Sequence, residues 1–223
     1  MTRTVLSKRT LPNYTKGEEI FNMVSHIVGG AFSVAALVIG VIASAFTGDV
    51  WKIVSVSIYG ATLVIMYTIS SVYHGLNKNT AKKVMQVIDH CDIYFLIAGT
   101  YTPILLCAIR PHNPAIAWTI FGVEWGLTAL AVTLNAIDLK KFSKLSMTCY
   151  IGMGWCIVAV LRPTIDCLTM SGFWWLLMGG VAYTIGAVLY GVGKKVHYMH
   201  CVFHIFVVIG SVLQYIAILK YVI

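Results

Sequence analysis

The sequence predicts an all-α membrane protein whose single domain crosses the bilayer seven times. Hydrophobic residues make up 59% of its 223 positions and charged residues only 11%, a composition typical of membrane proteins. Seven apolar stretches are each close to the roughly 20 residues that a helix needs to cross the hydrocarbon layer. Because lipid offers backbone amides no hydrogen-bond partners, stretches this continuous favour helices over barrel strands.

Polar residues or turn formers bound each predicted span. The first, Val24–Phe46, follows a polar tail of residues 1–19 and ends at Thr47-Gly48-Asp49. The tail contains no apolar run, so we expect it to be cytoplasmic and not a cleaved signal peptide. Pro111-His112-Asn113-Pro114 separates the third span from the fourth. The remaining spans, which complete one domain over residues 1–223, are Trp51–His74, Met85–Ile109, Ala115–Leu134, Leu145–Leu161, Gly172–Tyr190 and Tyr198–Ile218.

Lysine and arginine are divided unevenly between the two ends of these spans. One side carries four of them: Lys52, Arg110, Arg162 and Lys220. The other side carries 12: Arg3, Lys8, Arg9, Lys16, Lys78, Lys82, Lys83, Lys140, Lys141, Lys144, Lys194 and Lys195. Since positive charge stays in the cytoplasm, we expect the N-terminus inside and the C-terminus outside. Topology and anionic lipid headgroups then explain the net charge of +8 without a nucleic-acid partner.

The spans carry several polar and ionisable residues, which are costly in a membrane and are therefore candidates for function. The predicted topology places those of four spans at the same cytoplasmic depth. They are Glu19, Asn22 and His26 at the first span, Ser70 and His74 at the second, Asp89 at the third, and His200 and His204 at the seventh. The topology rests on lysine and arginine alone, so two independent features indicate a site at this depth.

His200 and His204 are four residues apart, which places both imidazoles on one helix face. This spacing is a standard way to present two nitrogens to one metal ion, although two histidines without further ligands more often form hydrogen bonds between helices. His74 reaches the same depth and is the natural third zinc ligand. Asp89 could bind the metal directly or act as general base toward its water. Ser70 lies one turn before His74 and could orient the site.

The spacings Glu19-x2-Asn22-x3-His26, Ser70-x3-His74 followed by Asp89, and His200-x3-His204 resemble the three-part signature of the progestin and adipoQ receptor family. The segments 88–103 and 203–211 look like its bacterial branch, the hemolysin III family. The resemblance implies zinc bound by His74, His200 and His204, with Asp89 nearby through water. It does not make Glu19, Asn22 and His26 metal ligands, and we expect them to support the ligands or pack helices. A wider superfamily with this layout includes alkaline ceramidases and suggests lipid amide hydrolysis.

Three functions follow from this interpretation. The first is a zinc-dependent hydrolase that acts on a lipid amide or ester, with Asp89 as the catalytic base. The second is a non-catalytic receptor or regulator of membrane lipid state, in which the zinc is structural. The third, a pore-forming cytolysin, fits poorly because seven apolar helices with a basic inner face indicate a resident protein of the cell membrane. All three contact membrane lipids and leave the oligomeric state open.

Residues outside these motifs receive other interpretations. We expect His197 to face lipid headgroups and His90 and Asp92 to be interfacial. Glu124 lies near the middle of the fourth span, where we expect it to be protonated and hydrogen-bonded. The six cysteines show no Cys-x-x-Cys spacing, which argues against a disulfide framework or a thiolate zinc cluster.

Overall fold

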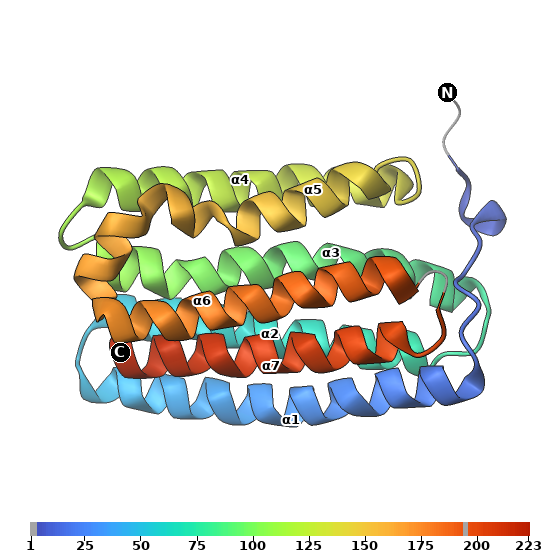
Figure 1. Ribbon diagram of the computed structural model, residues 1–223, viewed down its shortest axis with the longest axis horizontal. Helices are drawn as coiled ribbons and strands as arrows, with labels where there is room; N and C mark the ends of the chain where they lie inside the picture. The colour runs from blue at the N-terminus through green and yellow to red at the C-terminus, as the bar shows by residue number, and fades with distance from the viewer. Residues whose placement is uncertain (1–3, 194–195) are drawn as a thin grey trace.

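The computed structural model describes residues 4–193 and 196–223, and all regular structure in these two ranges is helical (Figure 1). The basic residues Arg3, Lys194 and Lys195, which enter the charge count, lie outside the described residues. The elements in chain order are η1 Leu6–Lys8, α1 Lys16–Phe46, α2 Val50–Gly75, α3 Thr80–Pro103, η2 Ile104–Ile109, α4 Pro114–Asp138, α5 Ser143–Gly154, η3 Cys156–Val160, α6 Leu161–Gly193 and α7 Met199–Tyr221.

Helix α1 begins eight residues before the predicted Val24, because a capping box starts it in polar sequence. The Thr15 hydroxyl accepts a hydrogen bond from the Glu18 amide at 3.2 Å, and the Glu18 carboxylate accepts one from the Thr15 amide at 2.8 Å. The predicted tail of residues 1–19 therefore ends at Thr15. As a result, Glu19, Asn22 and His26 all lie on one helix.

Helix α3 likewise begins before the predicted Met85. The Asn79 side chain caps it by accepting from the Lys82 amide at 3.0 Å. The Lys82 side chain, counted above as a loop cation, is only 2% exposed. The spans are predicted from continuous apolar residues, and the first turns of α1 and α3 are polar. The predicted spans therefore begin too late.

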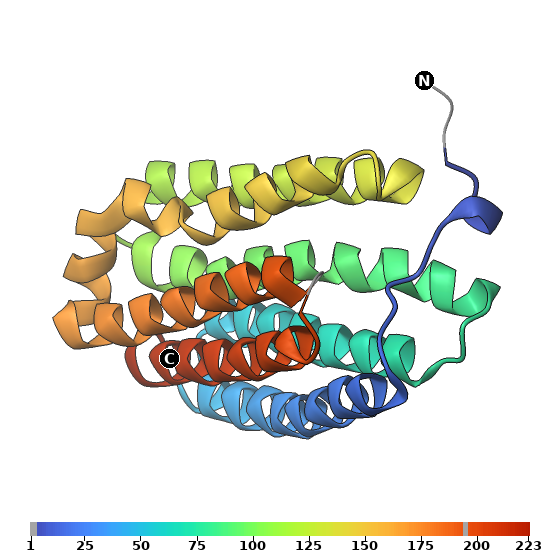
Figure 2. The same ribbon diagram turned by 45° about the vertical axis from the view of Figure 1, so that its right-hand side comes forward.

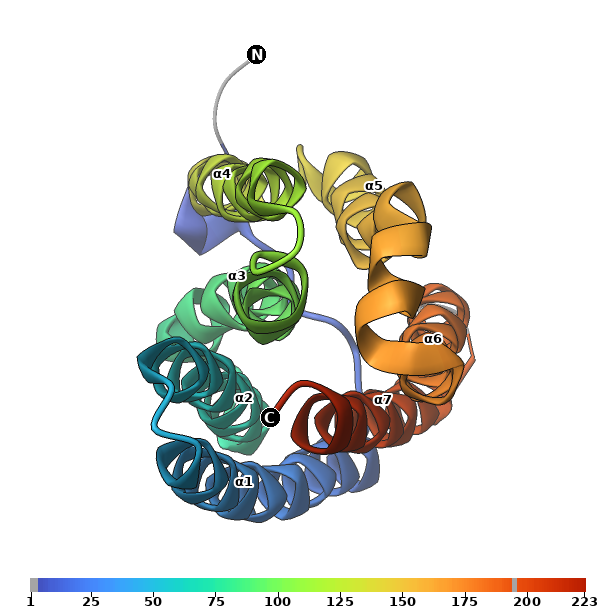
Figure 3. The same cartoon turned by 90° about the vertical axis from the view of Figure 1, so that its left-hand side faces the viewer.

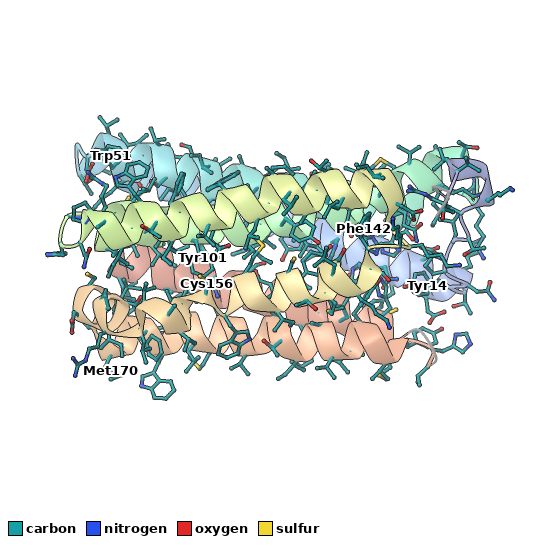
Figure 4. All side chains as sticks on the ribbon, turned by 90° about the horizontal axis from the view of Figure 1, so that it is seen from above. Tyr14, Trp51, Tyr101, Phe142, Cys156 and Met170 are labelled. Carbon is teal, nitrogen blue, oxygen red and sulfur yellow. The ribbon has the colours of Figure 1, made fainter. Side chains whose placement is uncertain are left out.

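The predicted fifth span, Leu145–Leu161, is not one helix. Helix α5 ends at Gly154, a 3₁₀ turn follows at Cys156–Val160, and α6 begins directly at Leu161. Tyr101 of α3 bridges this break, since its hydroxyl donates to the Gly154 carbonyl at 3.0 Å and accepts from the Ile157 amide at 2.8 Å. Figure 4 shows Tyr101 and Cys156 near the middle of the bundle. The predicted sixth span, Gly172–Tyr190, lies within the longer α6, which kinks at Thr169 with φ 63°.

Most helices that follow one another in the chain pack side by side, and the last helix, α7, also packs against the first, α1. Helix α7 packs against both α1 and α6, α2 lies between α1 and α3, and α4 packs on α3 (Figure 3). Helices α5 and α6 run in opposite directions, and α1 begins at the end of the bundle opposite the C-terminus (Figure 1). We call the end at which α1 begins and α2 stops the N-terminal end.

Six helical stretches among the described residues are long and apolar enough to cross a membrane. One of them, Ser143–Gly193, contains both α5 and α6. Large apolar side chains such as Val28, Val38 and Ile42 are exposed along α1, as expected of a surface that faces lipid. On its other face Gly29 lets α1 approach α2 closely, because a side chain there would collide with the ring of Tyr67.

Candidate metal centre

Three buried histidines meet at the N-terminal end of the bundle. His74 lies in the last turn of α2, and His200 and His204 lie in the first turns of α7; their exposures are 3%, 6% and 1%. One ring nitrogen from each can be chosen so that all three lie within 4.8 Å of one another. The spacing of four within α7 brings the Nε2 atoms of His200 and His204 to 3.1 Å. Together they form a group that could hold a metal ion.

The donor atoms of this group fit zinc. His74 Nδ1 lies 2.7 Å from Glu19 Oε2, and because a carboxylate only accepts, Nδ1 must carry the proton. The remaining nitrogen, His74 Nε2, is buried without a hydrogen-bond partner among the described residues. Buried polar atoms normally have a hydrogen-bond partner. A metal ion bound to His74 Nε2 and to the nearby nitrogens of His200 and His204 would account for the missing partner. Three imidazole nitrogens are an ordinary zinc donor set.

Glu19 links this group to a buried cation. Its Oε1 accepts from Lys82 Nζ at 2.7 Å, and the same ammonium donates to the Leu76 carbonyl at 3.0 Å. Glu19 therefore holds the His74 ring in one tautomer and one orientation, the arrangement that tunes many zinc histidines. Asn22 is fully buried with its Nδ2 3.5 Å from His74 Nδ1.

His26 contacts the group in another way. Its ring stacks on His204 with centroids 3.8 Å apart and planes inclined by 30°, and it meets the Tyr67 ring edge-on at 5.0 Å. The structure thus places all three residues of the first-helix motif beside the histidines, and His26 lies outside the group of three whose nitrogens converge.

Tyr14 was not predicted from the sequence, yet it covers the group from outside. Its ring stacks on His200 with centroids 4.7 Å apart and planes inclined by 16°. Burial and the nearby Tyr190 and Asp89 raise the pKa of Tyr14, so its phenol keeps its proton. Figure 4 shows Tyr14 at the opposite end of the bundle from Trp51 and Met170.

The segment before α1 crosses the N-terminal end of the bundle (Figure 2). The Thr4 amide donates to Asp138 Oδ2 at the end of α4 at 2.8 Å, and Lys78 Nζ donates to Asn13 Oδ1 at 3.1 Å. These bonds hold the segment over the cavity described next. The Thr15–Glu18 spacing is a capping-box signature that would have placed the start of α1, and hence Tyr14, next to the site. Nothing in the sequence marks Lys82 as buried.

A cavity of about 1090 Å³ opens beside the histidines. Its polar end is lined by His26, Ser70, Asp89, His200 and His204, and it also borders residues 10–14 of the N-terminal segment. Apolar side chains of α3, η2, η3, α6 and α7 also line it, among them Leu96, Ile104, Ile157, Leu176 and Val207, together with polar side chains such as Lys140, Lys144 and Gln214. The chamber therefore joins a polar end to an apolar body, which suits an amphipathic ligand.

Asp89 and Ser70 lie at this cavity and are not part of the group of three histidines. The Asp89 side chain is 17% exposed, with Oδ2 3.6 Å from His90 Nδ1. Ser70 is buried one turn before His74 on α2. Asp89 is thus placed to contact a molecule in the cavity.

The predictions for ionisable residues outside the motifs have different outcomes. His197 is largely exposed and its Nδ1 lies 3.3 Å from Glu18 Oε2, so it is a surface residue; that it faces lipid headgroups stays a prediction. The prediction that Asp92 is interfacial is wrong, because it is 4% exposed in the packed part of α3. His90 is half-buried, and its Nε2 lies 3.1 Å from the Tyr190 hydroxyl. The carboxylate of Glu124 is fully buried beside the Cys156 thiol, and neither oxygen has a nitrogen or oxygen partner among the described residues.

Several proteins are similar to this chain over most of its length. It is 35% identical to Hemolysin-3 of Bacillus cereus over 205 residues, which cover 92% of each chain. It is 34% identical to the Hemolysin-3 homolog of Bacillus subtilis (strain 168) over 208 residues, 93% of this chain and 96% of that one. Similarity to the human Monocyte to macrophage differentiation factor is weaker, at 26% over 198 residues, 86% of this chain and 80% of that one. No solved structure matches the chain.

These matches agree with the resemblance indicated by the motif spacings, which is thereby confirmed. The apolar helices and the relatives together identify a multi-pass protein of the bacterial plasma membrane. A family model described as Haemolysin-III related matches residues 14–215, nearly the whole chain. The protein belongs to the Haemolysin-III related family.

Proposed function

We propose that this protein is a zinc-dependent hydrolase of a lipid amide or ester, acting at the cytoplasmic side of the bilayer. One observation carries the proposal: His200, His204 and Asp89 line the same cavity as a set of apolar side chains large enough to contact an acyl chain. At about 1090 Å³ the cavity is at the upper end of the usual range for ligand sites, roughly 300–1,000 Å³, and has room for an acyl chain.

The location of the site follows from a seven-crossing topology. The stretch Ser143–Gly193 has 51 residues, and at about 1.5 Å per residue it is more than twice as long as the roughly 30 Å hydrocarbon layer. Helices α5 and α6 run in opposite directions (Figure 1), which supports counting this stretch as two crossings. The excess of lysine and arginine at the N-terminal end favours a cytoplasmic location for that end, and with it for the histidines.

Each residue has a role in the proposed reaction. His74, His200 and His204 hold the zinc, which when bound supplies a Lewis acid and lowers the pKa of water to about 7. Glu19 keeps the His74 proton on Nδ1, so that Nε2 stays free as a ligand. Asp89 accepts the proton of the attacking water and can return it to the leaving group. The apolar walls place the acyl chain and keep bulk water from the carbonyl.

A second candidate is a non-catalytic regulator of membrane lipid state with a structural zinc. It is supported by the origin of the three histidines, which come from α2 and α7 only. These two helices flank α1 in the packing, so an ion shared between them would hold both against α1. The name of the Bacillus cereus relative, Hemolysin-3, is the support for the third candidate, a membrane-permeabilising protein.

The test compares the wild type with Asp89→Asn in lipid nanodiscs. The substrates are an N-dodecanoyl amide and a dodecanoyl ester, each with a fluorescent leaving group. We expect turnover by the zinc-loaded wild type, and a fall of about 10²–10⁴-fold in Asp89→Asn with the zinc content unchanged, the usual effect of losing a positioned acid–base group.

Two other results would favour the alternatives. Zinc loss in Asp89→Asn together with a lower melting temperature, and no turnover by the wild type, would support a structural zinc with Asp89 as a ligand. Leakage of entrapped dye from liposomes at low protein concentration, again without turnover, would support the membrane-permeabilising candidate.

A further inference from the structure

We infer that His26 binds the polar end of the lipid-like molecule held in the cavity, through a hydrogen bond from or to its imidazole ring. The inference rests on the proposed function for the class of ligand, a lipid with an amide or ester group next to an acyl chain. It assigns His26 a direct contact with this ligand, where the sequence predicts only support of the metal ligands or helix packing.

The first reason is that both nitrogens of His26 lack protein partners. The residue is 3% exposed, and neither Nδ1 nor Nε2 has a hydrogen-bond partner among the described residues. A buried imidazole with no partner on either nitrogen is unusual, since the large majority of buried side-chain polar atoms are paired.

The second reason is that a metal ion does not account for these nitrogens. The three converging histidines lie within 4.8 Å of one another, and His26 is outside that group. Its ring lies almost face to face with His204, inclined by only 30°. A ring nitrogen binds a metal ion in the plane of its own ring, and the planes of these two stacked rings are separated, so the stack disfavours one ion bound by both His26 and His204.

The third reason is position. His26 lines the same cavity as Asp89, His200 and His204, which is also lined by apolar side chains such as Leu96 and Val207. Contacts with His204 on one side and Tyr67 on the other fix the ring plane, so its edge is presented in a set direction. A neutral imidazole offers one donor and one acceptor. A carbonyl oxygen can accept from the first, and an amide N–H can donate to the second.

The test measures binding of radiolabelled dodecanamide to the full-length, zinc-loaded protein in nanodiscs. His26→Phe keeps the aromatic contacts and removes both nitrogens, whereas His26→Gln keeps a donor and an acceptor. We expect His26→Phe to weaken dodecanamide binding about tenfold, as for loss of one hydrogen bond, and His26→Gln to stay within about threefold of the wild type. His112→Phe, at the far end of the bundle, is the matched control and should bind like the wild type. Zinc content should be unchanged in all three variants.

A second measurement does not depend on how the variants fold. In the wild type labelled with ¹⁵N-histidine, dodecanamide should shift the ring-nitrogen signals of His26. Undiminished binding by His26→Phe, zinc loss in His26→Gln, no binding of dodecanamide by the wild type, or unmoved His26 signals at saturation would each overturn the inference. Neither readout needs turnover. His26-dependent binding without hydrolysis would reject the hydrolase and keep this contact, while hydrolysis with binding insensitive to His26 would do the reverse.

Discussion

Replacing Glu19 by glutamine should weaken both zinc binding and the fold, for two separable reasons. Its carboxylate lies 2.7 Å from His74 Nδ1 and 2.7 Å from Lys82 Nζ, and the lysine side chain is only 2% exposed. Removing one partner of a buried ion pair costs about 3–5 kcal/mol, because the other charge is left uncompensated. The Glu19 side chain is 14% exposed, so we expect the lower end, about 3 kcal/mol.

The loss of zinc-binding free energy should be smaller than the loss of folding stability. Glutamine can still accept from His74 Nδ1–H but carries no charge, and changes to groups that orient a ligand typically cost about 10–100-fold in metal affinity. We expect about tenfold, measured by competition with a chelator of known affinity. Stability should be measured on the metal-free protein, so that weaker zinc binding does not enter the melting temperature.

The double variant Glu19→Gln, Lys82→Met separates the two effects. It removes both charges, and replacing a buried ion pair as a whole is often close to neutral. It should recover at least half of the stability that Glu19→Gln loses, but not all, because the lysine also donates to the Leu76 carbonyl. Zinc affinity should stay as low as in the single variant. A double variant less stable than Glu19→Gln, or one with wild-type zinc affinity, would refute the assignment of these roles.

Three further predictions concern the same end of the bundle. His200→Ala should abolish stoichiometric zinc binding while the exposed His197→Ala retains it, as measured by metal analysis of the purified proteins. Tyr14→Ala should speed transfer of zinc to a water-soluble chelator roughly three- to tenfold, the value of an aromatic contact, and Tyr14→Phe should not, because the stack on His200 is kept. Cysteine-labelling reagents confined to the cytoplasm should reach a cysteine tag on the N-terminus and not one on the C-terminus; the reverse pattern would contradict the proposed cytoplasmic location of the site.

The sequence predicts a helix well where the change from apolar to polar residues coincides with its ends. Helix α2 runs from Val50 to Gly75 against a prediction of Trp51–His74, because a turn and a polar loop flank it. The same criterion fails at α5, whose apolar residues continue through a break at Gly154. That break is bridged by Tyr101, about fifty positions earlier in the chain, a tertiary contact that no local pattern contains.

At the site, too, sequence patterns predict some residues, whereas others can be found only from tertiary contacts. Depth and spacing bring His74, His200 and His204 to one place, since helices that cross a bilayer must align their polar ends. Spacing could not show how these histidines are held, because that depends on residues that look like solvent-exposed sequence. Tyr14 lies in a polar tail and Lys82 near the end of a basic loop, yet Tyr14 is half-buried against His200 and Lys82 is buried beside Glu19.

Three residues that contact the histidines come from one short segment of the chain. Tyr14 contacts His200, Glu19 contacts His74, and His26 contacts His204. One short segment, from the residue before the capping box through the first turns of α1, therefore touches each of the three. Because α1 also packs between α2 and α7, its docking positions the histidines of both helices. Zinc binding and the docking of α1 must then be thermodynamically coupled, so the ion should protect the amides of α1 from hydrogen exchange more than those of α4, which contributes no residue to the group of three histidines.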